Sequence, residues 1–321
     1  MPVLEVDNLT TYYDTLRGPV KAVENVSFQV DKAEALGLAG ESGCGKTTVA
    51  LSILRLLPNN GRIVNGRILF QGKDILKMSE DEFRKKIRWK GISIVFQGAM
   101  NALNPVLKVS DQIAEAIRIH EPNVGKEEIN ERIVKLFELV GLDPSRKDYY
   151  PHEFSGGMRQ RALIAMALAC NPELLISDEP ATALDVIVAA QILKLLTEIK
   201  EKLKLSMILI THDLSIIAET CNKVGVMYGG MLVEFGEVMD IFKKPFHPYT
   251  QGLISAFPGI TKERVPMVSI PGSPPDLLRP PQGCRFHPRC KYALEICTSK
   301  PPPQTFIKEN HFVRCWLYEK T

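Results

Sequence analysis

Nine residues near the start of the chain have the composition of a phosphate-binding loop. The sequence GESGCGKTT, from Gly40 to Thr48, follows the apolar stretch ALGLA and precedes the helix-prone stretch VALSILRLL. Glycines in such a loop let backbone N–H groups turn toward phosphate oxygens, and the following helix adds its positive end. Lys46 is placed to reach the β- and γ-phosphates, and Thr47 to ligate Mg²⁺. The nucleotide contacts predicted in this loop are Gly40, Ser42, Gly43, Cys44, Gly45, Lys46, Thr47 and Thr48.

A pair of carboxylates follows a second apolar stretch. In ELLISDEP, Asp178 and Glu179 come at the tip of an expected strand. Asp178 can hold Mg²⁺ through water, and Glu179 can polarise an attacking water. Many buried strands end in acidic residues, so the pair is informative because it accompanies a phosphate loop. Together the two motifs predict NTP hydrolysis.

A third motif, HEFSGGMRQR, opens an expected helix. Ser155, Gly156 and Gly157 are small enough to let N–H groups approach another phosphate. The same residues also suit a capped helix start with no further role.

These motifs require an α/β scaffold. From residue 1 to about 255, apolar strand-like runs alternate with helix-period segments, a pattern typical of a mostly parallel sheet. Of the 22 prolines, 13 fall at or after Pro245, in segments such as SIPGSPPDLLRPP. Such segments sustain neither helices nor central strands, so we expect an irregular C-terminal extension that needs a partner surface or a clip.

Composition narrows the class of protein further. The net charge of +3 is small against 40 basic and 37 acidic residues, so no nucleic-acid partner is expected. The N-terminal sequence lacks a secretory pattern, and the apolar run ALIAMALAC is too short to cross a bilayer. We therefore expect a cytoplasmic protein, in which clustered thiols more often hold metal than form disulfides.

Four of the seven cysteines lie in the extension. Cys284, Cys290, Cys297 and Cys315 follow a Cx5Cx6Cx17C spacing, whereas Cys44, Cys170 and Cys221 are expected to be packed residues. Four thiolates suit zinc or an iron–sulfur cluster. The absence of a CxxC pair favours a bulkier cluster, and zinc or no metal remain alternatives.

Taken together, the motifs resemble the ATP-binding subunit of an ATP-binding cassette (ABC) transporter. FSGGMRQ is similar to the family signature, GESGCGKT to its phosphate loop, LLISDE to its carboxylate strand and ALD, which ends at Asp185, to its subunit-contact loop. Gln97 and His212 match the two single-residue switches, and Tyr13 matches the residue that stacks on adenine, with Tyr12 as its rival. The resemblance implies a P-loop NTPase fold with a mostly parallel core sheet, an antiparallel β subdomain and a helical signature subdomain.

The resemblance also implies a mechanism. Two ATPase subunits enclose two ATP molecules head to tail, and Ser155 and Gly157 of one subunit close over the γ-phosphate held by the other. Glu179 activates water, His212 contacts the γ-phosphate, and Gln97 touches Mg²⁺ and senses the membrane partner. Lys46, Gln97, Glu179 and His212 are the expected catalytic residues. The other expected contacts with nucleotide or Mg²⁺ are those of Thr47, Asp178, Ser155, Gly156, Gly157 and Asp185.

Finer features resemble the oligopeptide and dipeptide importers and their nickel-importing relatives. These are FQGAMNALNP, YPHEFSGGMRQR, DEPATALDV and KKPFHPYTQGLISAFP, with departures that include Ala33 where a turn glycine is usual. The branch implies an ATP-binding domain at 1–255 and a C-terminal extension at 256–321, in which the four cysteines hold a [4Fe–4S] cluster.

The implied assembly lies at the inner face of the cell membrane. Its other members are a second ATPase subunit, a non-identical paralogue, together with two transmembrane permease subunits and an extracytoplasmic peptide-binding protein. A nickel or other small-solute importer is an alternative of the same family. A soluble ABC ATPase of iron–sulfur cluster assembly is another, whereas the 108 residues between Lys46 and Ser155 leave too little room for the ATPases of DNA repair.

Overall fold

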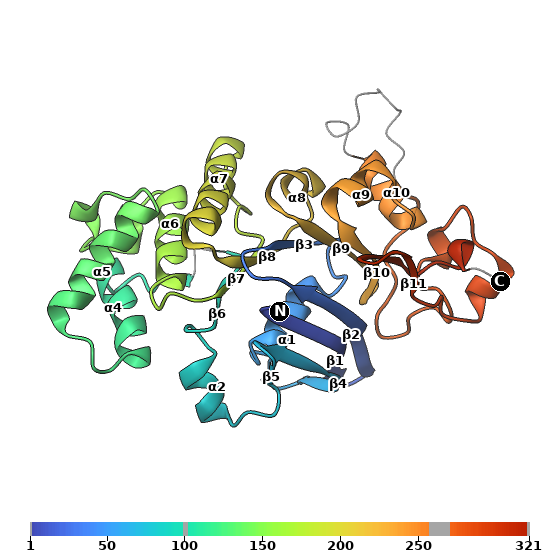
Figure 1. Cartoon of the computed structure of the whole chain (residues 1–321), viewed down its shortest axis with the longest axis horizontal. Helices are drawn as coiled ribbons and strands as arrows, with labels where there is room; N and C mark the ends of the chain where they lie inside the picture. Colours follow the sequence, from blue (N-terminus) through green and yellow to red (C-terminus); the bar gives the residue numbers. More distant parts are fainter. Residues whose placement is uncertain (1, 99–101, 257–269, 320–321) are drawn as a thin grey trace. The chain divides into compact units, whose positions relative to one another are not determined.

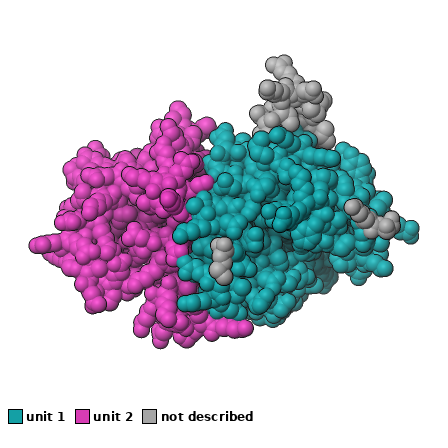
Figure 2. Space-filling model, in the orientation of Figure 1, with its two compact units in different colours: residues 1–76, 209–321 teal, residues 77–208 magenta. Residues whose placement is uncertain are grey.

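The computed structural model describes residues 2–98, 102–256 and 270–319. They fall into two compact units, Met1–Leu76 with Leu209–Thr321 and Lys77–Ile208, coloured teal and magenta in Figure 2. The motif residues 99–101, within FQGAMNALNP, and the extension residues 257–269 lie outside the described chain.

The first unit contains an antiparallel sheet in the order β2-β1-β4-β5 (Figure 1). Its strands are β1 (Leu4–Thr15), β2 (Gly18–Val30), β4 (Gly61–Phe70) and β5 (Lys73–Asp74). Helix α1 (Lys46–Ile53) packs against β1 and β2. This sheet is the antiparallel β subdomain that the family resemblance implies.

The same unit contains part of a second sheet, and strand β3 (Ala35–Ala39) of this sheet leads into the phosphate loop. The strands of this part follow the order β11-β12-β10-β9-β3, in which only the neighbours β3 and β9 (Lys223–Tyr228) run parallel. Every residue of both strands is buried, as expected for parallel strands covered on two faces. The remaining elements are β10 (Met231–Glu237), α8 (Leu214–Thr220), α9 (Val238–Lys243) and α10 (Pro248–Ser255).

Part of the extension is regular, which corrects the expectation of a wholly irregular tail. Strands β11 (Thr305–Lys308) and β12 (His311–Val313) form a hairpin, and β12 pairs antiparallel with β10. The stretch has no proline after Pro303, so its backbone can complete a ladder. The rest consists of loops and three short 3₁₀ turns, His287–Arg289, Glu295–Thr298 and Trp316–Tyr318.

The second unit combines buried strands with a group of helices. Its strands follow the order β8-β7-β6, with β6 (Ile92–Val95) parallel to β7 (Leu174–Asp178), and β8 (Ser206–Ile210) runs across the boundary between the units. The helices are α2 (Glu80–Lys86), α4 (Val109–His120), α5 (Lys126–Leu139), α6 (Gly156–Ala167) and α7 (Val186–Leu203), with 3₁₀ turns at Pro144–Arg146 and Pro151–Glu153. Helices α4, α5 and α6 pack together as the expected helical subdomain. No helix among the described residues is both long enough and apolar enough to cross a bilayer.

A fully buried carboxylate ties the extension to this scaffold. Glu234 on β10 accepts hydrogen bonds from the backbone N–H groups of Phe246 (2.8 Å) and His247 (3.0 Å). Its Oε1 also lies 3.1 Å from Nε2 of His311 on β12. The His247 ring in turn accepts the N–H of Tyr249 at 3.0 Å and so begins helix α10. One buried acid therefore orders both the start of α10 and the hairpin of the extension.

Burial lowers the pKa of His247 from its usual 6.5 to about 4. The folded protein keeps this ring neutral while the unfolded chain takes up a proton below about pH 6.5, so stability is complete above that value and is lost as pH falls toward 4. We predict a loss of about 2 kcal/mol between pH 7 and pH 5 from this group. His247→Asn retains an oxygen that can cap α10 and should flatten the pH dependence in urea titrations. Equal pH dependence in the two proteins would exclude His247 as the source.

Candidate nucleotide site

The phosphate loop connects β3 to α1 through three glycines with left-handed φ. Gly40 has φ 145°, Gly43 77° and Gly45 104°. A β-carbon on Gly40 would lie 2.2 Å from the carbonyl oxygen of Met227, and one on Gly45 would lie 2.3 Å from that of Ala22. At Gly43, by contrast, no atom lies within 4 Å of the place that a β-carbon would occupy. Two glycines are therefore required by close backbone packing, and the third faces open space at the mouth of the loop.

The amino group of Lys46 lies inside this loop. Its Nζ donates to the carbonyl oxygens of Gly40 (2.7 Å) and Glu41 (3.1 Å) and lies 3.6 Å from Sγ of Cys44, and the side chain is 6% exposed. Burial raises the pKa of the Cys44 thiol, which keeps it a neutral packed residue. The first turn of α1 contains no acidic residue, so no side chain of that turn opposes an anion at the helix start. Thr47 is exposed beside the buried lysine.

Tyr13 and Tyr12 differ in their direction from strand β1. The Tyr13 hydroxyl donates to Oγ1 of Thr48 at 3.2 Å, whereas the Tyr12 hydroxyl donates to Glu24 on β2 at 3.4 Å. Of the two, Tyr13 is thus the one joined to the phosphate loop. Both rings are partly exposed.

His212 also belongs to the first unit. It follows β8, is exposed, and precedes Asp213, which caps α8 by accepting the N–H of Ser215 at 2.8 Å. The backbone N–H of the preceding Thr211 donates to the carbonyl of Leu38 on β3 at 3.3 Å. Strand β3 leads directly into the phosphate loop, so the histidine and the loop depend on the same strand.

The second unit brings three of the predicted residues to one sheet edge. In the parallel pairing Val95 lies opposite Ser177, and the chains then continue to Gln97 and Glu179. Nε2 of Gln97 donates to Oε2 of Glu179 at 2.8 Å, and Thr182 donates to the same oxygen at 2.9 Å. Asp178 is 2% exposed, whereas Glu179 is more accessible.

The backbone of Glu179 is in an unusual conformation. Its φ of 45° is left-handed, which for a residue other than glycine costs on the order of 1 kcal/mol. Strain of this kind at the end of a strand is typical of functional positions.

The predicted signature residues form the start of helix α6. Ser155 is its N-cap and accepts the N–H of Met158 at 3.3 Å, so the simpler alternative, a capped helix start, describes what the hydroxyl does in this structure. Asp185 likewise caps α7 by accepting the N–H of Val188 at 3.0 Å. The next two side chains, Val186 and Ile187, are largely exposed.

The four cysteines of the extension are free thiols in the structure. The N–H of Cys284 donates to the carbonyl of Cys297 at 2.8 Å. Burial above all, together with the charges of the other three cysteines, raises the pKa of Cys315 to about 12, and burial raises that of Cys284 to about 11. Cys284 and Cys290 pack against the apolar core. Among the described residues, however, no three His, Cys, Asp or Glu side chains are grouped to hold a single metal ion.

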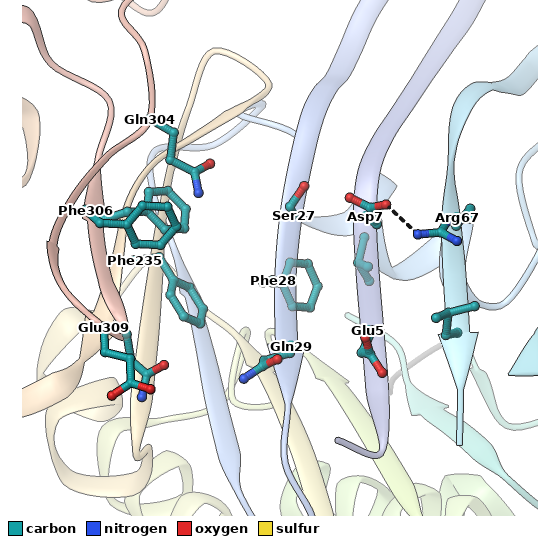
Figure 3. Close-up of a pocket in the computed structure, with 14 residues that line it drawn as sticks. Glu5, Asp7, Ser27, Phe28, Gln29, Arg67, Phe235, Gln304, Phe306 and Glu309 are labelled. Carbon is teal, nitrogen blue, oxygen red and sulfur yellow. Dashed lines mark hydrogen bonds and ion pairs between the residues drawn. The ribbon is translucent and has the colours of Figure 1, made fainter. Parts of the chain in front are cut away.

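A separate hollow of about 350 Å³ lies between the antiparallel sheet and the extension hairpin (Figure 3). Phe28, Phe235 and Phe306 lie along it, and an ion pair of 3.1 Å joins Asp7 to Arg67 at one side. None of its lining residues is a predicted nucleotide contact.

Several contacts of the phosphate loop were not predicted from the sequence. Glu41, the second residue of the loop, accepts a two-pronged hydrogen bond from Arg289, and its N–H is bonded to Tyr249. The available signal for this contact is the pair of arginines in CRFHPRC, Arg285 and Arg289, which are spaced four apart.

Comparison with known proteins defines the class first. The family model for ABC transporters matches residues 23–182. The structure is also similar to cbiO1 from Clostridium perfringens, part of the ABC transporter complex cbiONQ, with TM-score 0.66 and 29% identity over 76% of this chain and 91% of that one. A dimeric ATP-binding cassette, MJ0796, in a post-hydrolysis state with ADP and Pi, has TM-score 0.65 and 25% identity over 73% of this chain and 98% of that one. The fold is therefore that of an ABC ATPase.

A match in the C-terminal region, together with relatives that align over nearly the whole chain, defines the branch of the ABC family. The model for the oligopeptide/dipeptide transporter C-terminal region matches residues 233–297. The dipeptide transport ATP-binding protein DppD of Bacillus subtilis (strain 168) is 46% identical, over 99% of this chain and 95% of that one. The oligopeptide transport ATP-binding protein OppD of Escherichia coli (strain K12) is 47% identical, over 95% and 90%. The chain belongs to the family of ATP-binding proteins of dipeptide and oligopeptide ABC transporters.

The start of α6 offers a matched pair of substitutions. A β-carbon on Gly157 would lie 2.6 Å from Cγ1 of Val188 on α7, whereas one on Gly156 would lie 3.4 Å from Leu184. We predict that Gly157→Ala destabilises the protein by about 1–3 kcal/mol through overpacking. Gly156→Ala should change stability by less than about 0.5 kcal/mol, because that contact is ordinary. Urea unfolding measures the stability of both variants. Equal losses of stability would show that the contact with Val188 is not the cause.

Proposed function

We propose that this chain binds and hydrolyses ATP to power the import of di- and oligopeptides through an ABC transporter. The observation that most supports an ATP site is the phosphate loop. It contains the buried Lys46 and the left-handed Gly43, which faces open space. Relatives named for dipeptide and oligopeptide transport support the substrate class. They give no support to a nickel importer or to an ATPase of iron–sulfur cluster assembly.

In the proposed reaction, the first unit holds the nucleotide. Tyr13 stacks on adenine, Lys46 binds the β- and γ-phosphates, and Thr47 offers its hydroxyl to Mg²⁺. His212 contacts the γ-phosphate. The metal neutralises phosphate charge when bound, and the oxygen ligands of Thr47, Asp178 and Gln97 suit a hard cation.

The second unit supplies the group that activates water. Glu179 accepts the proton, or polarises the water, from the position set by its left-handed backbone. Gln97 and Thr182 occupy one of its oxygens in this structure. A water molecule that bonds to that oxygen must replace or share one of these donors. Gln97 is the donor that would turn toward Mg²⁺.

The working form is proposed to be a head-to-tail pair of ATPase subunits. Ser155, Gly156 and Gly157 would close over the partner's γ-phosphate, with Asp185 at the contact between subunits. Exposed Val186 and Ile187 next to Asp185, and the dimer described for MJ0796, support this arrangement. The partner ATPase is proposed to be a non-identical paralogue, bound with it to two permease subunits at the inner face of the membrane, where an extracytoplasmic protein delivers the peptide. The division into an ATPase domain at 1–255 and an extension at 256–321 stays a prediction.

We also propose that Cys284, Cys290, Cys297 and Cys315 hold a [4Fe–4S] cluster. Four free thiols close enough to shift one another's pKa support the donor set. The wide spacing of the cysteines, without a CxxC pair, favours the cluster over a single zinc ion. When bound, the cluster would cross-link the loops of the extension. Zinc remains the alternative.

For the ATPase, the decisive variant is Glu179→Gln. It should bind ATP as tightly as the wild type while hydrolysing it at least about 100-fold more slowly, because the general base is lost and the phosphate contacts are not. Phosphate release by the assembled transporter and calorimetric ATP titration measure the two properties. Glu173→Gln, directly before the start of the same strand, is the matched control. Normal turnover by Glu179→Gln would remove this residue from its role.

For the cluster, the test is spectroscopic. Protein purified without oxygen should be brown, with absorption at about 400 nm that Cys290→Ser abolishes. Cys221→Ser removes a thiol outside the group and should leave the spectrum unchanged. A colourless protein that contains one zinc ion per chain would overturn the cluster.

A further inference from the structure

A buried ion pair joins the extension to the phosphate loop. Nη1 and Nη2 of Arg289 donate to Oε2 and Oε1 of Glu41 at 2.7 and 2.9 Å, in the parallel two-bond geometry that makes arginine–carboxylate pairs strong. The arginine side chain is 6% exposed and that of Glu41 27%. Nε of Arg289 donates to the carbonyl of Pro271 at 2.7 Å. All three nitrogens of the guanidinium are therefore bonded within the first unit.

Glu41 is held at its backbone as well as at its side chain. Its N–H is bonded to the hydroxyl of Tyr249 at 2.9 Å, and its carbonyl accepts the ammonium of Lys46 at 3.1 Å. The residue therefore connects the extension and helix α10 to the lysine that is proposed to bind phosphate. A shift of Glu41 would move the carbonyl that Lys46 uses.

Three aromatic rings pack together beside the ion pair of Arg289 and Glu41. The ring centroids of Tyr228 and Tyr249 are 4.6 Å apart, and that of Phe286 lies 5.0 Å from Tyr228 and 5.4 Å from Tyr249. The guanidinium of Arg289 lies 5.7 Å from the centre of the Tyr228 ring. All three rings are buried, and Phe286 belongs to the same turn of the extension as Arg289.

The ion pair also neutralises the negative charge of Glu41. Glu41 places a carboxylate in a loop that is proposed to surround a triphosphate, and like charges at short range in a partly buried site repel strongly. Arg289 neutralises that carboxylate from the side of the extension. Removal of the arginine would leave an unpaired negative charge next to the phosphates.

We propose that Arg289 is a positioning residue for ATP binding, which acts through Glu41 on the phosphate loop. This inference rests on the ATP site proposed above. It gives the extension a role at the nucleotide site that does not require any ligand on the cysteines.

The test uses the full chain and the ATP affinity of four proteins. Arg289→Gln should bind ATP about tenfold more weakly than the wild type, because a hydrogen-bonded charge pair is broken and one charge is left. Glu41→Gln should weaken binding by about threefold or less, since the charge that it leaves is the cation of Arg289, which does not repel phosphate, and the glutamine oxygen can still accept a hydrogen bond from it. The double variant should return to the affinity of Glu41→Gln alone. This rescue is the signature of action through Glu41, and a purely structural role of Arg289 would not produce it.

Two controls keep the result interpretable. Arg285→Gln removes an arginine of the same extension that is equally buried but bonds to Glu24 and Gly229, and Glu41→Gln should not rescue it. If Arg289→Gln does not fold, Arg289→Lys keeps the charge without the two-pronged geometry and should bind ATP about two- to threefold more weakly. Thermal unfolding of each protein confirms that it is folded.

The outcomes separate the inference from the proposed function. Wild-type affinity in Arg289→Gln, or additive losses in the double variant, would overturn the role of Arg289. If the wild type itself does not bind ATP, or if Lys46→Ala binds as well as the wild type, the ATP site has failed instead.

Discussion

The phosphate loop depends on backbone segments that approach each other too closely for side chains. Gly40 lies against the carbonyl of Met227 at the end of β9, and Gly45 against that of Ala22 on β2. These strands are distant from the loop in sequence, so two other parts of the first unit fix its shape. Lys46 then closes the loop by bonding to the carbonyls of Gly40 and Glu41. A loop held in this way is ordered before a nucleotide arrives, which lowers the entropy lost on binding.

The extension also helps to hold the phosphate loop in place, through contacts made by its arginines. Arg285 bonds to the carbonyl of Gly229, and the N–H of the adjacent Gly230 bonds to the carbonyl of Cys44 in the loop at 3.0 Å. Arg289 reaches the loop at Glu41. A proline-rich segment has few backbone hydrogen bonds of its own to order it. Buried arginines and aromatic rings supply that order here, and Cys284 and Cys290 flank the stretch of chain that contains both arginines.

The sequence predicted features whose signal is local. The glycine spacing of the phosphate loop, the carboxylates after β7 and the helix start at Ser155 each follow from a few neighbouring residues. Ala33, which departs from the usual turn glycine, has φ 60°, so the position still requires a left-handed turn. The structure also joins Tyr13, in preference to Tyr12, to the phosphate loop, although its role at adenine stays a prediction.

What the sequence did not predict depends on long-range pairing. Arg289 and Glu41 are separated by 248 positions, and no periodicity relates them. The β11–β12 hairpin was missed because the proline count was applied to the whole extension, although Thr305–Val313 contains none. The left-handed φ of Glu179 was also missed, since glutamate has no preference for that region.

Gln97 and Glu179 show how sheet register can place a proposed switch residue beside the proposed catalytic base. Parallel strands keep a one-to-one register, so residues two positions beyond the pair Val95 and Ser177 reach the same sheet edge. The amide of Gln97 then donates to the carboxylate of Glu179. A carboxylate whose oxygen is occupied by an amide donor is less available to accept a proton from water. Any motion that draws Gln97 away, as its proposed contacts with Mg²⁺ and a membrane partner would require, removes one donor from this oxygen, while Thr182 still bonds to it. In the proposed mechanism, the same hydrogen bond that orders the site therefore also restrains hydrolysis until Gln97 moves.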